Sequence, residues 1–311
     1  MKKIISNSLV LGVIAAATYI CMCYVINHIS LAERRAAVWM IPYLQRKGGQ
    51  EQRMMYDYKK DTKYDAIVIG SSHAYRGYDP RVFEANGLSL FNAGSSSQHA
   101  LASRILMNDF IKPAINTLVI IDIYDKVFEG EGMECNMKLI QNASDDPVAR
   151  HLLSYQPDMR TFNAYITRQF SSDAANEVEA KGYITNGYCT KQDTLFTFPD
   201  SVAWDFVPNH QFLHALDGLM QDLERAGIKY ILVSHPQPAI KWQSEYHSSF
   251  VKFLSPLIST HNARYVDLTF DKRFNQYTCF ADQNHMNQAG VDLFNHLLID
   301  SLRQLNYLNT P

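Results

Sequence analysis

The chain has 311 residues, of which 47% are hydrophobic and 19% charged, so it can bury a full core and is not disordered as a whole. Its 29 Lys and Arg residues against 31 Asp and Glu residues give a formal charge of -2, so we expect no nucleic-acid partner. Its 5 cysteines show no C-x-x-C spacing, which argues against a structural zinc site or a dithiol redox pair. We therefore expect one or at most two globular domains.

The first segment of the chain is apolar. Residues 9–26 form an uncharged run behind Lys2 and Lys3. As a helix this run would span about 27 Å, close to the roughly 30 Å of a bilayer core. The apolar region of a cleaved signal peptide is shorter, about 7–15 residues, so an uncleaved anchor is favoured and secretion after cleavage stays open. We expect residues 1–27 to bind the lipid bilayer as a single-pass anchor, with the main domain outside the cytoplasm.

The next segment, residues 28–62, is rich in Arg, Lys, Gln and Tyr and is interrupted by Gly48 and Gly49. We interpret it as a helical stalk or linker whose charges face solvent. The remaining residues, 63–311, are then the main domain. Within it, residues 127–208 are polar and aromatic with weak periodicity, which predicts an inserted cap.

Two covalent features of the insertion stay open at this stage. Cys135 and Cys189 could form a disulfide in an oxidising compartment, but Cys279 competes as a partner. Residues 142–144 read Asn-Ala-Ser and match a glycosylation sequon, a short pattern that often occurs by chance.

The main domain alternates short apolar runs with helical patterns. Buried strands are predicted at residues 65–70, 88–92, 117–122, 229–234 and 264–267. Helices are predicted at residues 100–111, 209–226, 245–260 and 289–305. This alternation predicts an α/β fold of flavodoxin-like, three-layer type, with a five-stranded parallel sheet covered on both faces. Functional side chains are then expected at the carboxyl ends of the strands.

Residues suited to acyl-transfer chemistry follow these strands. Ser72 comes after the first strand, Gly94 after the second, and Asp282 and His285 after the fifth. A serine hydroxyl becomes a good nucleophile only when a neighbouring base removes its proton. Histidine can be that base, a carboxylate can orient it, and a glycine amide can stabilise a developing oxyanion.

Two motifs resemble those of the SGNH (GDSL-like) hydrolase superfamily. The first is the apolar strand ending in Gly-Ser-Ser at residues 67–72, and the second is D-x-x-H at residues 282–285, extended as M-N-Q-A-G to residue 290. The resemblance implies a catalytic triad in which Ser72 is the nucleophile, His285 the base and Asp282 its orienting carboxylate. It also implies an oxyanion hole formed by the backbone amides of Ser72 and Gly94.

One motif of that superfamily is missing. Instead of G-x-N-D, the chain has Asp-Ile-Tyr-Asp at residues 122–125 after the third strand. Loss of one oxyanion donor can cost about 10²–10³ in rate. The chain therefore resembles a divergent, membrane-anchored branch whose members are accessory proteins of polysaccharide O-acyltransferases.

The resemblance leaves two functions open. The first is a serine ester hydrolase or O-acyltransferase that acts outside the cytoplasm on acylated, in particular acetylated, cell-surface carbohydrate. The alternative is a catalytically weak or inactive SGNH scaffold that binds a membrane O-acyltransferase. No cofactor is implied, because a G-x-G-x-x-G loop and a P-loop lysine are both absent from the sequence.

Several other polar residues have both a functional and a structural interpretation. Asn92, Tyr124 and His235 are candidates for substrate binding, although Asn92 could support the loop around Gly94 or turn the chain, and Tyr124 could be structural. His235 is a rival base without an acid near it in sequence. Ser72 itself could cap the helix that follows it, since serine is a common N-cap, and His73 is expected to pack or to lie at the rim. No metal site is expected from the scattered histidines 210, 214, 247 and 261.

Overall fold

A five-stranded, wholly parallel sheet lies at the centre of the protein, in the order β2-β1-β3-β6-β7. The computed structural model describes residues 2–28, 47–143, 146–170, 181–191, 205–238 and 241–308. The strands are β1 (Ala66–Ile69), β2 (Leu90–Asn92), β3 (Leu118–Asp122), β6 (Tyr230–Ser234) and β7 (Tyr265–Asp267). All five predicted strands are present, each slightly shorter than predicted.

The strands are apolar except at their carboxyl ends, where all but β1 finish in a polar residue, because both faces of the sheet are covered. Alternate residues of β1 enter different clusters: Ile67 and Ile69 belong to one, Ala66 and Val68 to the other. This alternation follows from the two-residue period of a strand. The chain therefore buries two apolar layers, one on each side of the sheet.

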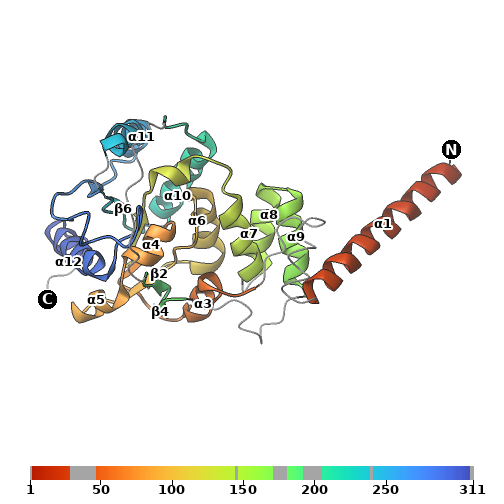
Figure 1. Ribbon diagram of the computed structural model, residues 1–311, viewed down its shortest axis with the longest axis horizontal. Coiled ribbons are helices and arrows are strands. Elements are labelled where there is room, and N and C mark those ends of the chain that lie inside the picture. The colour runs from red at the N-terminus through yellow and green to blue at the C-terminus, as the bar shows by residue number, and fades with distance from the viewer. Residues whose placement is uncertain are drawn as a thin grey trace.

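Helices form the two outer layers (Figure 1). One face is covered by α6 (Ala100–Leu106), its π-helical continuation η1 (Met107–Ile111), α10 (His210–Arg225) and α11 (Lys241–Thr260). The other face is covered by α4 (Ser72–Gly77), α5 (Pro80–Ala85) and α12 (Gln288–Gln304). The predicted three-layer α/β architecture with a five-stranded parallel sheet is confirmed.

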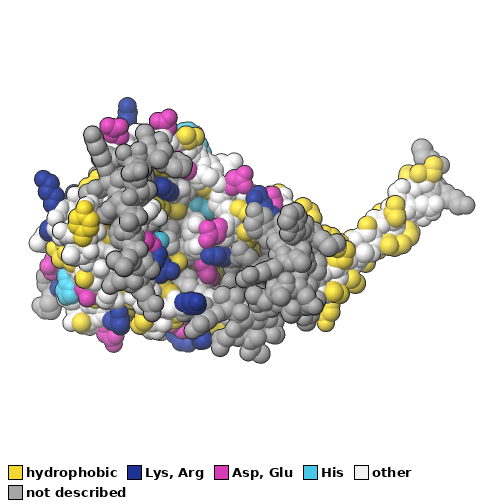
Figure 2. Space-filling model, in the orientation of Figure 1, with side chains coloured by type: hydrophobic (Ala, Val, Ile, Leu, Met, Phe, Trp, Pro, Cys, Tyr) yellow, Lys and Arg dark blue, Asp and Glu magenta, His cyan; other side chains and the backbone are white. Residues whose placement is uncertain are grey.

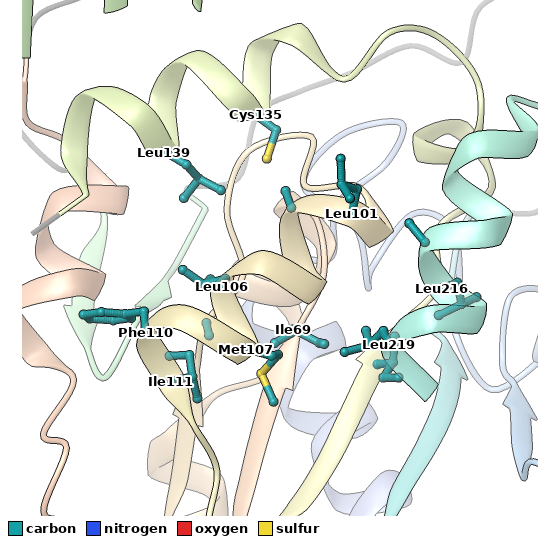
Figure 3. Packing of buried hydrophobic residues seen from close by; sticks show 14 of the residues in the cluster. Ile69, Leu101, Leu106, Met107, Phe110, Ile111, Cys135, Leu139, Leu216 and Leu219 are labelled. Atoms are coloured by element: carbon teal, nitrogen blue, oxygen red, sulfur yellow. The ribbon is translucent and has the colours of Figure 1, made fainter. Parts of the chain in front are cut away.

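The predicted insertion contains regular structure where it is described. Its elements are η2 (Asp125–Phe128), α7 (Met133–Asn142), α8 (Asp146–Tyr155), α9 (Met159–Arg168) and the hairpin of β4 (Tyr183–Thr185) and β5 (Tyr188–Cys189). Figure 3 shows Cys135 and Leu139 of α7 facing Leu101 and Leu106 of α6. The helical part of the insertion therefore shares the core of the sheet. Residues 144–145, 171–180 and 192–204 of the insertion lie outside the described residues.

The predicted stalk is corrected at its C-terminal end. There α3 (Gln50–Asp57) packs on the domain, with Met54 and Tyr58 buried in the core. The Gln50 side-chain amide donates to the carbonyl oxygens of Gly94 and Gly187, at 3.1 Å each. The polar composition that suggested a solvated linker belongs to an amphipathic helix that packs on the domain. Residues 29–46 of the predicted stalk lie outside the described residues.

The N-terminal helix α1 (Lys2–His28) projects from the body of the protein (Figure 1). Within it, Ile4–Val25 is, among the described residues, the one helical stretch long and apolar enough to cross a membrane. Its apolar side chains are exposed along most of the helix (Figure 2). Near its C-terminal end, the Tyr19 hydroxyl donates to Asn163 Oδ1 of α9 at 2.5 Å. A membrane anchor and a signal sequence would both have this form.

The disulfide between Cys135 and Cys189 that the sequence left open is not formed, and all five cysteines are free. The buried Cys135 thiol lies 3.7 Å from Ser95 Oγ, whereas the Cys189 thiol donates to the Lys181 carbonyl at 3.2 Å. The two thiols thus have different neighbours. Ser144 of the sequon lies outside the described residues.

Candidate active site

The first strand delivers Ser72 to the carboxyl edge of the sheet. Between β1 and α4, a Cβ on Gly70 would come within 2.7 Å of Asp122 Cβ, so glycine lets the chain turn closely past the end of β3. Ser71 is the N-cap of α4, and its Oγ accepts a hydrogen bond from the His73 amide at 3.3 Å. The capping alternative for Ser72 is therefore wrong, and Ser72 is a partly exposed residue in the first turn of α4.

The D-x-x-H motif forms a tight turn that places the imidazole over Ser72. Asp282 Oδ1 accepts hydrogen bonds from the amides of Asn284 and His285, at 2.8 Å each. Both carboxylate oxygens of Asp282 lie 3.1 Å from His285 Nδ1. On the other side of the ring, His285 Nε2 lies 2.9 Å from Ser72 Oγ. The fold thus brings the three predicted triad residues into one hydrogen-bonded chain.

The rest of the same motif positions the following helix. Asn287 is the N-cap of α12, and its Oδ1 accepts from the Gly290 amide at 3.0 Å. A Cβ on Gly290 would lie 2.1 Å from the Cys279 carbonyl oxygen, so this position needs glycine. The spacing D-x-x-H-x-N-x-x-G therefore combines a carboxylate turn, a helix cap and a close backbone approach.

Burial and positive charge keep the His285 imidazole neutral. Burial has the largest effect, followed by the charges of Lys191 and Arg76 and by His235, and together they lower the pKa of His285 to about 3. At neutral pH the ring can therefore accept a proton. Lys191 also forms an ion pair with Asp282 Oδ2.

Sequence reasoning missed both of these cations. Lys191 follows the β4–β5 hairpin in the insertion, where no periodicity or motif marks it. Arg76 had a signal, because it lies four residues after Ser72 and so shares a face of α4 with it.

A buried polar cluster lies behind Ser72. The ring of His73 stacks on that of His235, with centroids 3.9 Å apart, and on that of His285, at 4.9 Å. His235 Nδ1 lies 3.1 Å from Asp122 Oδ2, and the Tyr78 hydroxyl donates to the same oxygen at 2.9 Å. Burial, reinforced by the neighbouring histidines, lowers the pKa of His73 well below its ordinary value, so this ring is neutral.

Two of the predicted substrate-binding residues have structural roles instead. Asn92 is fully buried, and its Nδ2 donates to the carbonyl oxygens of Ala74 and Tyr78, at 2.7 and 3.0 Å. His235 is 1% exposed and is bonded to Asp122, so it is neither at the substrate surface nor free to replace His285. In both cases the side chain satisfies buried polar groups that would otherwise destabilise the fold.

The predicted oxyanion hole is altered at Gly94. The Gly94 amide donates to Asn92 Oδ1 at 3.1 Å, so in this arrangement it is not available to a substrate oxygen. The Ser72 amide lies in the first turn of α4, where the helix supplies no acceptor for it. Tyr124 is buried with its ring centroid 3.9 Å from that of His73, and its substrate contact stays a prediction.

Two of the scattered histidines are held by carboxylates. His247 Nε2 lies 2.9 Å from Asp267 Oδ2, and its Nδ1 lies 3.5 Å from Asp125 Oδ2. His261 bridges Asp217 and Glu224, at 2.7 and 2.9 Å. In the described part of the chain, no group of three His, Cys, Asp or Glu side chains is arranged to hold a metal ion.

Comparison with known proteins gives distant structural likenesses. No family model matches the chain, and no curated protein matches its sequence. A catalytic mutant of an acetylxylan esterase from Geobacillus stearothermophilus is 11% identical, with a TM-score of 0.42 over 81% of this chain and 100% of that one. A GDSL-like lipase from Bacteroides thetaiotaomicron is 12% identical, with a TM-score of 0.40 over 81% and 94%. An α/β hydrolase from the Lake Arreo metagenome is 15% identical, with a TM-score of 0.42 over 82% and 99%.

Proposed function

We propose that this protein is a serine ester hydrolase or O-acyltransferase that uses Ser72, His285 and Asp282 as a catalytic triad. The observation that carries the proposal is the continuous contact from Ser72 Oγ to His285 Nε2 at 2.9 Å and from His285 Nδ1 to Asp282 at 3.1 Å. Side chains 213 residues apart in sequence meet here in the order that nucleophilic catalysis requires.

The first half of the reaction makes an acyl-enzyme. Ser72 Oγ attacks the ester carbonyl carbon while its proton passes to His285 Nε2. Asp282 holds the Nδ1 proton and stabilises the imidazolium that forms. The tetrahedral intermediate then collapses, the acyl group stays on Ser72, and the leaving alcohol takes the proton from His285 Nε2.

The second half decides between hydrolysis and transfer. Water or a sugar hydroxyl gives its proton to His285 and attacks the acyl-enzyme carbonyl. The released products are a carboxylic acid in the first case and a new ester in the second, and Ser72 regains its proton in both. The proposed substrate is an acylated, in particular acetylated, carbohydrate outside the cytoplasm. The apolar helix α1, behind two lysines, supports that location.

The state of the oxyanion hole supports a second candidate, a catalytically weak or inactive scaffold that binds a membrane O-acyltransferase. The Gly94 amide is bonded to Asn92 Oδ1 and must leave it before a substrate oxygen can be bound. The sequence also lacks the asparagine donor of the third motif. In addition, a low pKa makes His285 a weaker base.

Covalent labelling separates the two candidates. We expect a fluorophosphonate probe to label the full-length protein at Ser72, identified by peptide mass spectrometry. The Ser72→Ala variant should neither be labelled nor hydrolyse 4-nitrophenyl acetate. Ser71→Ala is the matched control, because it removes the neighbouring hydroxyl, which caps α4, and keeps the nucleophile.

The outcomes are decisive for the role of Ser72. Full hydrolysis by a folded Ser72→Ala variant would remove this residue from the mechanism. Absence of labelling in a folded wild-type protein would favour the scaffold. Release of acetate, compared with transfer of acetyl to added xylo-oligosaccharide, then distinguishes a hydrolase from a transferase.

A further inference from the structure

The short helix α4 presents two accessible side chains at the active site. Ser72 and Arg76 are partly exposed, whereas His73, Ala74 and Tyr75 between them are buried. Residues four apart lie on one face of a helix, one turn above another. A guanidinium group is therefore held one helical turn from the hydroxyl proposed as the nucleophile.

The contacts of Arg76 position its side chain but do not neutralise it. Its Nη1 donates to the Thr190 carbonyl oxygen at 3.4 Å, and its guanidinium carbon lies 5.0 Å from the centre of the Tyr75 ring. Among the described residues no carboxylate forms an ion pair with Arg76, whereas Lys191 is paired with Asp282. Most donors of this guanidinium are therefore directed to no protein acceptor in the described part of the chain.

Arg76, Glu51 and Lys138 all act on the pKa of Tyr75, but Glu51 and Lys138 each have a partner other than Arg76. Lys138 pairs with Glu134 at 2.9 Å, and the buried Glu51 accepts from the Ser96 amide at 3.2 Å. Glu51 and Arg76 both act on the pKa of Tyr75, which burial raises first of all, yet the two form no ion pair with each other.

Arg76 also acts electrostatically on the site. After burial, its charge is a cause of the lowered pKa values of both Lys191 and His285. The positive potential of Arg76 therefore reaches the imidazole that contacts Ser72.

From this arrangement we propose that Arg76 binds an anionic group, a carboxylate or a phosphate, that the substrate carries near its ester. The inference rests on the proposed function and specifies its substrate class as acidic rather than neutral carbohydrate. Planar guanidinium donors match both carboxylate and phosphate, and such charge-assisted hydrogen bonds are the strong ones. The chemistry is thus the same for a uronic acid and for a polyol phosphate.

The test compares matched esters at about pH 8, where His285 is neutral in every variant. The three probes are acetylated oligogalacturonate, acetylated glycerol phosphate and acetylated xylo-oligosaccharide. Their hydrolysis by the full-length protein is measured as the release of acetate. For each acidic ester, kcat/KM is divided by kcat/KM for the neutral ester. We expect Arg76→Gln to lower this quotient about tenfold for one or both acidic esters, mainly by raising KM. Arg76→Lys should restore part of that ratio, and Lys252→Gln on α11 is the control for loss of a cation elsewhere.

A binding measurement makes the inference independent of turnover. In the Ser72→Ala background, calorimetry with deacetylated oligogalacturonate and with glycerol phosphate should show about tenfold weaker binding after Arg76→Gln. An unchanged kcat/KM ratio, or equal binding with and without Arg76, would overturn the inference. If the wild type neither hydrolyses any of the esters nor transfers acetyl to added xylo-oligosaccharide, the proposed function fails and the binding measurement alone decides about Arg76. Thermal unfolding of each variant shows whether it is folded.

Discussion

Lys191 Nζ and Asp282 Oδ2 form an ion pair that joins the inserted segment to the carboxylate contacting His285. The side chains of both residues are about a quarter exposed, 27% for Lys191 and 23% for Asp282. A residue that no motif marks thus contacts Asp282, and after burial its charge is a cause of the lowered pKa of His285. This gives Lys191 a positioning role whose effect is on the basicity of His285.

Substitution of Lys191 should move the acid limb of the activity profile. Lys191→Met removes a cation that lowers the pKa of His285, so this pKa should rise and the base should become protonated at a higher pH. We expect the midpoint of the acid limb of kcat/KM, near pH 3 in wild type, to lie at a higher pH in Lys191→Met. Lys191→Arg retains the charge and serves as the control, and a profile of Lys191→Met that coincides with wild type would contradict the role.

The wild-type profile is itself a prediction. The active form of His285 is neutral, and its pKa lies at about 3 rather than at the ordinary value of about 6.5. Between about pH 8 and pH 5 we therefore expect kcat/KM for 4-nitrophenyl acetate to stay nearly constant. A histidine of ordinary pKa would lose about thirtyfold over this interval. Rates from Ser72→Ala, measured in parallel, correct for uncatalysed hydrolysis.

The sheet and the contact of Ser72, His285 and Asp282 were predictable because both have local signals. Strands β1, β2, β3 and β6 are short, mainly apolar runs because they are buried on both faces, and the pattern of β1 led directly to Ser72. Asp282 and His285 are three residues apart, so a single turn holds them together, and spacing alone reveals the pair. Residues whose roles depend on contacts with segments far away in the sequence were less predictable.

The errors have a common physical origin in contacts between distant segments. Asn92 was assigned to substrate binding and Gly94 to the oxyanion hole, whereas the alternative that Asn92 supports the loop around Gly94 is confirmed, because Asn92 Oδ1 accepts from the Gly94 amide while its Nδ2 bonds the backbone of α4. His235 similarly lacked an acid in sequence, whereas the fold supplies Asp122 from a neighbouring strand. The polar composition around α3 hid Met54, which is completely buried.

The glycine at the start of α12 should be intolerant of a side chain. In Gly290→Ala the new Cβ would meet the Cys279 carbonyl oxygen at 2.1 Å, and this backbone atom cannot rotate away. We expect a loss of about 1–3 kcal/mol in the free energy of unfolding, measured in urea. Labelling of Ser72 should also slow, because the displaced turn carries His285.

A second glycine provides the contrast for this substitution. A Cβ on Gly218 in α10 would meet Arg104 Nη1 at 2.2 Å, but that atom is the end of a flexible side chain. Gly218→Ala should therefore change stability by no more than about 1 kcal/mol. Equal losses in the two variants would show that the Cys279 contact does not constrain position 290.

The buried pair of Asp122 and His235 should be costly to break. Their side chains are 0% and 1% exposed, so removal of His235 leaves the buried Asp122 carboxyl with only the Tyr78 hydroxyl as a side-chain donor among the described residues. We expect His235→Ala to lower the free energy of unfolding by about 3–5 kcal/mol. The exposed pair of Arg150 and Asp146 is the control, and Arg150→Ala should cost less than about 1 kcal/mol. Similar costs for the two variants would contradict a stabilising role of the buried pair.

His247 should make the stability of the fold fall at alkaline pH. Burial lowers the pKa of His247, but its contacts with Asp125 and Asp267 outweigh burial and raise the pKa to about 9. The unfolded value is about 6.5, so the stabilisation is complete below about pH 6.5 and is lost as pH rises through about 9. In urea unfolding at about pH 6, His247→Gln should be less stable than wild type by about 1–2 kcal/mol, allowing for solvent screening. The difference should nearly vanish at about pH 10, and a difference that stays constant with pH would mean that the imidazolium is not the stabilising form.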